Sequence, residues 1–249
     1  MAGHSKWAKV KHFKGALDAK RGKIFSRLSR EIIMAAKGGG DPRLNHRLRT
    51  AIDAAKAQNM PNDTIDRAVK KGTGELGGDA MVEIIYEGYA PGGVALMIEC
   101  ATDNKNRTAA DLRSAFSRNH GSMGTAGSVA HQFTRKGEIR LPLASVDEEK
   151  LLDAALDAGA DDVSNDGEDH IVLTAPDQLF AVANGLREKG LAATSAKLIM
   201  QPQTLIHVGD ASTASQIVRL CEILDDLDDV QNIYANYDIP DEIMEKIAD

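Results

Sequence analysis

The residues of this chain best suited to chemistry are cations and aromatic rings near its beginning. Lysines alternate there with rings, in the series Lys6, Trp7, Lys9, Lys11, His12, Phe13 and Lys14. An ammonium group can neutralise a phosphate while a neighbouring ring stacks on a base or a ribose. The alternative is a solvated basic surface whose rings fill the core of a small helical bundle. The extent of positive charge beyond this segment favours contact with nucleic acid.

Positive charge continues as far as Gly72 and then gives way to negative charge. Residues 1–72 contain 17 Lys and Arg against 6 Asp and Glu, whereas the rest of the chain contains 13 against 31. The net charge of −7 for all 249 residues therefore conceals a basic module attached to an acidic body. This asymmetry predicts an anionic partner for the basic module, and the acidic body repels that partner.

Apolar periodicity predicts that the basic module is a bundle of three helices. Residues 22–37 form an amphipathic helix whose cations gather opposite its apolar stripe. We expect a second helix with Asp41 as its N-cap and Pro42 as its first residue, and with Leu44 directed inward. A short third helix ends at Gly72.

The candidate nucleic-acid contacts include two cations outside this module. Residues 102–108 join a predicted strand to the N-terminus of a helix expected from Thr108 to Asn119, where free backbone N–H groups can bind an anion. Capping of that helix by Asn106 or Thr108 explains the same residues. The full set of predicted contacts is Lys6, Trp7, Lys9, Lys11, His12, Lys14, Lys20, Arg21, Lys23, Arg27, Arg30, Lys37, Arg43, Arg47, Lys105 and Arg107. Charge alone does not distinguish DNA from RNA, because phosphate contacts carry no sequence information.

Beyond a linker at 72–79 the pattern changes to alternating strands and helices. Residues 138–201 follow the order β-α-β-β-α-β, which is that of a ferredoxin-like fold. Elements before and after them, including a strand expected at 128–133, complete a second α/β domain. The predicted fold class is α+β, with an N-terminal basic helical bundle followed by two ferredoxin-like α/β domains, one inserted in the other. The predicted domains are 1–78, 79–135 with 205–249, and 136–204.

The spacing of reactive residues indicates no metal, cofactor or catalytic site. The seven histidines form no i,i+4 pair, the two cysteines form no CxxC motif, and no GxSxG motif occurs. The loop at 121–127 lacks the Gly-Lys-Ser/Thr ending of a P-loop, and we expect it to be flexible and to become ordered on a partner. The acidic run at 222–229 is expected to be a solvated helix end, with repulsion of nucleic acid or contact with a basic protein as the alternatives.

These observations predict a binding protein that is not an enzyme and has no small-molecule substrate. No apolar run reaches the ~20 residues of a membrane span, so we expect no membrane partner. Two widely separated cysteines fit a reducing compartment, and the expected location is cytoplasmic.

After Met1 the chain reads AGHSKWAKVKHFKGALDAKRGKIFSRLSREI, which resembles the opening of the YebC/PmpR family. The resemblance runs the whole length of the chain and includes the motifs at 59–62, 86–93 and 102–108. His131 departs from it, because many relatives carry a bulky apolar or aromatic residue there.

The resemblance implies a fold and two alternative functions. It implies three domains, one helical and two α/β, and a DNA-binding transcriptional regulator. The alternative is a ribosome-associated translation factor that binds rRNA or tRNA, because relatives include a mitochondrial translational activator and bacterial factors that relieve stalling on proline-rich sequences.

Overall fold

The computed structural model describes residues 17–248. The chain divides into two compact units, and Thr134–Gln201 form one of them. The residues before and after this segment form the other unit. The predicted α+β class, with one α/β domain inserted in another, is confirmed.

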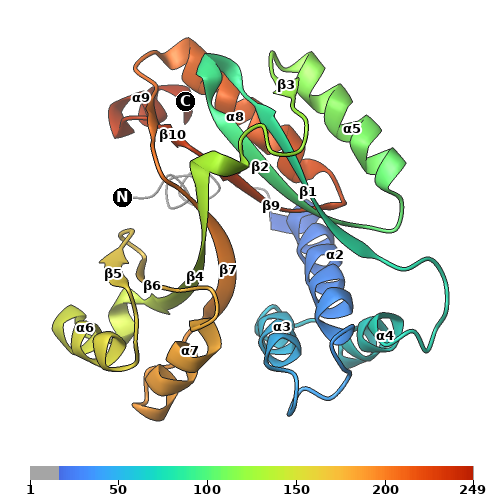
Figure 1. The fold of residues 1–249 in the computed structure, drawn as a ribbon, viewed down its shortest axis with the longest axis vertical. Helices are drawn as coiled ribbons and strands as arrows, with labels where there is room; N and C mark the ends of the chain where they lie inside the picture. Colours follow the sequence, from blue (N-terminus) through green and yellow to red (C-terminus); the bar gives the residue numbers. More distant parts are fainter. Residues whose placement is uncertain (1–16, 249) are drawn as a thin grey trace. The chain divides into compact units, whose positions relative to one another are not determined.

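The first unit begins with a bundle of three helices, α2 (Leu17–Ala36), α3 (His46–Ala57) and α4 (Asn62–Gly72). Figure 1 shows α3 and α4 on either side of α2. Their apolar stripes form one core that includes Ile32, Leu48, Ala55, Ile65 and Ala68. Helix period alone predicts such a core, because residues three and four apart share a face.

Helix α3 starts later than the Asp41-Pro42 signal predicts. The Asn45 side chain caps it by accepting a hydrogen bond from the backbone N–H of Leu48 at 3.0 Å. The same amide group donates to Ala35 O at 2.7 Å, which ties the start of α3 to the end of α2. Leu44 therefore precedes the helix and is 84% exposed, so the prediction that it faces inward is wrong.

Gly72 ends α4 at a close contact with α2. A Cβ atom at Gly72 would lie 2.6 Å from the Ala36 Cβ and would also clash with the Ile33 carbonyl oxygen. Only a residue without a side chain fits this contact.

We expect Gly72→Ala to lower the free energy of unfolding by about 2 kcal/mol, because the added methyl group overpacks the contact between α2 and α4. Gly22→Ala is the matched control, since a Cβ atom there meets nothing within 4 Å and alanine is the better helix former. Urea unfolding followed by circular dichroism measures both changes. Equal stability of the two variants would contradict the close approach at Gly72.

The outer α/β domain of the first unit is built on a four-stranded antiparallel sheet of order β3-β1-β2-β9. Before the insertion it contains β1 (Val82–Tyr89), β2 (Ala95–Thr102), α5 (Lys105–Arg118) and β3 (Ser122–Met123). After it come β8 (Ile206–His207), α8 (Ala211–Asp226), β9 (Val230–Ala235), β10 (Tyr237–Asp238) and α9 (Asp241–Ala248). Strands β8 and β10 pair in parallel as a separate ribbon.

Helices α5 and α8 supply the core of this domain together with the sheet. Alternate residues of β2, such as Leu96 and Ile98, pack with Phe116 of α5 and with Ile217 and Leu220 of α8. The apolar face of β2, formed by every second residue, and the apolar stripes of α5 and α8 thus pack together in one layer.

Two expected elements of this domain have different boundaries. Helix α5 begins at Lys105 with Asn104 as its N-cap, so Thr108 lies inside the helix and does not open it. The strand expected at 128–133 does not form: this segment contains a 3-10 turn at Ala130–Gln132, and the next strand begins only at Phe133. The backbone N–H groups of Val129 and Ala130 donate to a side chain, as described below, and are therefore unavailable to a strand ladder.

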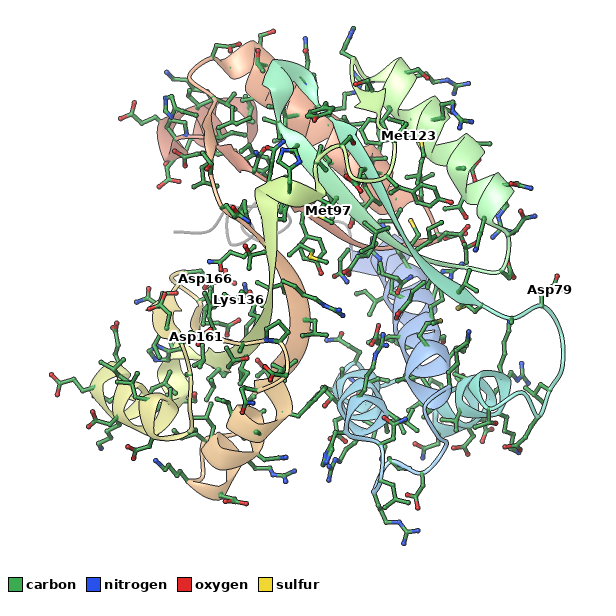
Figure 2. All side chains as sticks on the ribbon, viewed as in Figure 1. Asp79, Met97, Met123, Lys136, Asp161 and Asp166 are labelled. Carbon is green, nitrogen blue, oxygen red and sulfur yellow. The ribbon has the colours of Figure 1, made fainter. Side chains whose placement is uncertain are left out.

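The second unit has the ferredoxin-like arrangement. Its elements are β4 (Phe133–Pro142), α6 (Glu148–Asp157), β5 (Asp162–Asn165), β6 (Asp169–Thr174), α7 (Leu179–Glu188) and β7 (Ser195–Pro202). The sheet order β5-β6-β4-β7 places the first and third strands at the centre, as this fold requires. Figure 2 labels Lys136 and Asp161, which form an ion pair at 2.8 Å within this unit.

Candidate nucleic-acid interface

The basic face of α2 lies against the outer domain and contacts its carboxylates. Lys23 Nζ lies 2.6 Å from Asp226 Oδ1 and 3.3 Å from Asp225 Oδ2. Arg27 Nη2 lies 2.7 Å from Asp225 Oδ1, and Arg30 Nη2 lies 3.3 Å from Asp229 Oδ1. We call these three carboxylates, from Asp225, Asp226 and Asp229, the acidic cluster. The acidic cluster neutralises Lys23, Arg27 and Arg30, which the helical period places on one face of α2.

Arg27 is held most tightly of these three cations. Besides its ion pair, Nη2 donates to the Asp225 carbonyl oxygen at 2.6 Å and Nε donates to the Val230 carbonyl oxygen at 3.2 Å. The Asp225 carbonyl belongs to the last turn of α8, where the helix dipole favours a positive charge. Arg27 therefore docks α2 on the outer domain by charge and by hydrogen bonds together.

The acidic run at 222–229 is not simply a solvated helix end, and that prediction is wrong for Asp225 and Asp229. The side chains of Asp225 and Asp229 are 13% and 9% exposed, whereas Asp226 is 79% exposed. The charge pattern of the sequence predicts that the acidic body repels an anionic partner. In the structure, the acidic cluster contacts the basic helix α2 of its own chain. Attraction between oppositely charged modules of one chain accounts for this placement.

Asp229 connects three elements through one buried carboxylate. Its Oδ2 atom accepts hydrogen bonds from Thr108 Oγ1 at 2.7 Å, Arg107 Nη2 at 2.9 Å and Thr102 Oγ1 at 3.2 Å. Burial tends to raise the pKa of this carboxyl, but the bonds from Arg107 and Thr108 outweigh burial and lower it. The carboxylate is therefore charged at neutral pH and anchors α2, β2 and α5.

The segment expected to bind an anion at the start of α5 is occupied by its own side chains. Asn104 Oδ1 accepts the backbone N–H of Arg107 at 3.1 Å, which is ordinary helix capping. Arg107 itself pairs with Asp103 at 3.0 Å and with Asp229. Capping therefore explains this segment, by Asn104 in place of the Asn106 or Thr108 considered from the sequence. Lys105 is exposed on the first turn of α5.

The remaining described cations of the predicted set also have partners within the chain. Lys37 Nζ donates to the Met81 carbonyl oxygen, and Arg43 pairs with Asp41 at 2.7 Å. Arg47 bridges Glu31, at 3.1 Å, and Glu83. Nucleic-acid contact by these residues stays a prediction that requires each of them to exchange an internal partner for a phosphate.

Part of the predicted set lies outside the described residues. These residues are Lys6, Trp7, Lys9, Lys11, His12 and Lys14. Lys20 and Arg21 belong to the first turns of α2, and their side chains are likewise outside the described part of the chain.

The structure adds cations that the predicted set omitted. Lys56 of α3 and Arg67 and Lys70 of α4 are exposed, and none pairs with a carboxylate of the described residues. Lys71 of α4 is half-buried and likewise has no such partner. Their signal in the sequence is the i, i+3, i+4 spacing of 67, 70 and 71, which puts three cations on one face of α4. These side chains carry positive charge that remains available to a phosphate.

The glycine-rich loop at 121–127 is held at one end by an internal anion. The Glu87 carboxylate accepts backbone N–H groups from Gly127 and Val129 at 2.7 Å and from Ala130 at 2.9 Å. Burial alone raises the pKa of Glu87, yet these three bonds outweigh it and lower the pKa. Glu87 therefore holds the end of this loop, and ordering of the loop on a partner stays a prediction.

The described residues contain no candidate metal site, and their two thiols are not in the reactive thiolate form. No group of three or more His, Cys, Asp or Glu among them is placed to hold a metal ion. Burial raises the pKa of Cys100 and of Cys221 to about 12, so both thiols are protonated at neutral pH. Between residues 17 and 248, no helix combines the length and the apolar character needed to span a bilayer.

The fold and the charged contacts define a class of protein: a basic three-helix bundle docked by ion pairs on an α/β domain into which a ferredoxin-like domain is inserted. Two family models match the chain. One, described as the TACO1/YebC protein N-terminal domain, matches residues 5–75, and the other, described as the TACO1/YebC second and third domain, matches residues 81–237.

Known proteins of this kind match the chain over almost its full length. A protein of Geobacter sulfurreducens is 53% identical over 99% of this chain and 100% of its own, and one of Desulfotalea psychrophila is 51% identical over the whole of both. Each is named a probable transcriptional regulatory protein. The crystal structure of a conserved hypothetical protein from Aquifex aeolicus superposes with a TM-score of 0.86 at 46% identity, covering 91% of this chain and 94% of that one. The chain belongs to the YebC family, as its sequence motifs predict.

Proposed function

We propose that this chain is a regulatory protein that acts by binding nucleic acid, with DNA as its first target and without catalysis. Relatives about 50% identical over the full length are named probable transcriptional regulatory proteins, which supports regulation. The observation that carries nucleic-acid contact is the set of exposed cations on the helical bundle that have no carboxylate partner among the described residues. Lys56, Arg67 and Lys70 are its members.

The ion pairs of α2 reduce the number of cations that are available to nucleic acid. Because Lys23, Arg27 and Arg30 contact the acidic cluster, a phosphate would have to displace a carboxylate to reach them. Arg67 and Lys70 require no such exchange, and each can release a condensed counterion on contact with a phosphate. We therefore place the main described contacts on α4 and on the adjoining surface of α3.

The test is the affinity of the full-length chain for a labelled DNA duplex and for single-stranded RNA, measured by fluorescence anisotropy at several salt concentrations. The double variant Arg67→Gln/Lys70→Gln is expected to bind about tenfold more weakly. The slope of log affinity against log salt concentration should become shallower by up to ~0.9 for each lost duplex contact, or ~0.7 for each lost single-strand contact.

The matched control is Lys150→Gln/Arg187→Gln, which removes one exposed lysine and one exposed arginine from helices α6 and α7 of the other unit. Its affinity and slope should equal those of the wild type. Absence of binding to both nucleic acids at about 50 mM salt would refute the proposal. Binding to RNA alone would make RNA the target in place of DNA and would favour regulation of translation.

A further inference from the structure

A groove of about 400 Å³ lies on the first unit between α2 and α4. Helix α2 lines it with Ser26, Ser29 and Arg30, and α4 lines it with Thr64 and Lys71. Spacings of three and four residues along α2, and of seven along α4, put each set on one helix face, so the two faces oppose one another. The volume falls within the usual range of small-ligand sites, about 300–1,000 Å³.

Three hydroxyls and one ammonium group of this groove lack partners among the described residues. No described residue forms a hydrogen bond with the hydroxyls of Ser26, Ser29 or Thr64, and Lys71 pairs with no described carboxylate. The Nη1 atom of Arg30 is buried and also lacks an acceptor there. Buried guanidinium N–H groups usually have an acceptor, which marks this side of the groove as polar.

The donors of the groove match an oxyanion. Lys71 brings a positive charge without a carboxylate partner among the described residues, Arg30 is paired through Nη2 with Asp229 at 3.3 Å, and three hydroxyls can donate hydrogen bonds beside them. Asp103, the one acid that lines the groove, is paired with Arg107 at 3.0 Å, which leaves the groove with an excess of positive charge. Charged donors and hydroxyls converging from two helices are suited to a tetrahedral phosphate, which accepts several hydrogen bonds at once.

We infer that this groove binds one backbone phosphate of the nucleic-acid strand, held by Lys71 and the hydroxyls of Ser29 and Thr64, beside Arg30, which keeps its ion pair with Asp229. The inference rests on the proposed function and deepens it, since it converts a diffuse basic surface into a defined phosphate site. The exposed Arg67 and Lys70 of the same helix extend the path of the strand along α4. Phe25 and Met81 add apolar surface to the same groove.

The test separates hydrogen bonds from charge. In anisotropy titrations of the full-length chain with a labelled 12-nucleotide single strand, Ser29→Ala/Thr64→Val should bind about fivefold more weakly at an unchanged salt slope. Lys71→Gln should bind about tenfold more weakly and lose ~0.7 of slope. Ser114→Ala, a half-buried helical serine of α5 outside the groove, is the control and should match the wild type.

Each outcome bears on the inference, and thermal unfolding confirms that the variants are folded. Wild-type affinity of Ser29→Ala/Thr64→Val and of Lys71→Gln would overturn the phosphate site and leave the proposed function intact. Absence of strand binding by the wild type would overturn the phosphate site, and the proposed function falls as well only if the DNA duplex is not bound either. Titration with inorganic phosphate, followed by backbone NMR shifts, provides a second arm. Shifts at 26–30 and 64–71 without any effect of the variants on strand affinity would mean a free-anion site and would overturn the strand assignment.

Discussion

Replacing Asp229 with asparagine should lower the free energy of unfolding of the first unit by about 3 kcal/mol, the scale on which breaking a buried charged pair destabilises a protein. The carboxylate is 9% exposed and accepts bonds from Thr102, Thr108 and Arg107, with Arg30 at 3.3 Å. Asparagine keeps the volume but removes the charge that compensates Arg30. Because Arg107 is 48% exposed, solvent screens its share of the loss.

Urea unfolding of Asp229→Asn and of Asp228→Asn measures this effect. Asp228 is the matched control, since it is the neighbouring aspartate and is exposed. Its replacement should change stability by less than about 0.5 kcal/mol. Equal effects of the two substitutions would show that the contacts of Asp229 contribute nothing beyond an average surface charge.

Asp229 also gives the first unit a pH dependence of known sign. Its folded-state pKa is lowered from the ordinary 3.8, so the stabilisation is complete above that value and is lost as the pH falls through the folded-state pKa. The wild type should therefore lose stability in acid below about pH 4, and Asp229→Asn should lose less over the same range. Glu87, whose pKa is also lowered, contributes with the same sign in both proteins.

Removing the Arg27 side chain should have the second largest effect, and on stability more than on nucleic-acid affinity. Arg27→Ala breaks an ion pair and two bonds to backbone carbonyls at an interface where Arg27 is 20% exposed. We expect a loss of about 2 kcal/mol in the free energy of unfolding. Arg113→Ala, at an exposed arginine of α5, is the control and should cost less than about 0.5 kcal/mol.

A double-mutant cycle isolates the contact itself. Arg27→Ala and Asp225→Ala together should destabilise by less than the sum of the single changes, with a coupling of about 1.5 kcal/mol. Affinity for DNA should stay close to that of the wild type in Arg27→Ala, because this guanidinium is already occupied. A tenfold loss of affinity with unchanged stability would instead make the α2 face the nucleic-acid contact that helix period suggests.

Local signals predicted most elements of the fold and missed those set by long-range contacts. The ferredoxin-like order of the inserted domain follows from alternation of strand and helix periods, and the structure has it. The start of α3 did not follow, because Asn45 competes with Asp41 as a cap and is favoured by its bond to Ala35 on another helix. The expected strand at 128–133 failed for a similar reason, since Glu87, about 40 residues away in the sequence, takes its backbone donors.

The candidate site shows the same division. Sequence spacing correctly groups Lys23, Arg27 and Arg30 on one side of α2, because helix geometry alone decides which residues share a face. Spacing does not reveal that this side meets the acidic cluster. The groove between α2 and α4 has no sequence signature either, because its donors come from two helices and are ordinary serines, a threonine, a lysine and an arginine.

The sequence by itself determined the basic module, the acidic body, the helix and strand periods and the family of this protein, since each depends on residue types at short separations. Tertiary structure alone decided which positive charges are free. Arg27 and Asp225 are 198 positions apart, and no local pattern connects them. Charge is a property of composition, whereas its availability to a phosphate depends on what folding brings within hydrogen-bond distance.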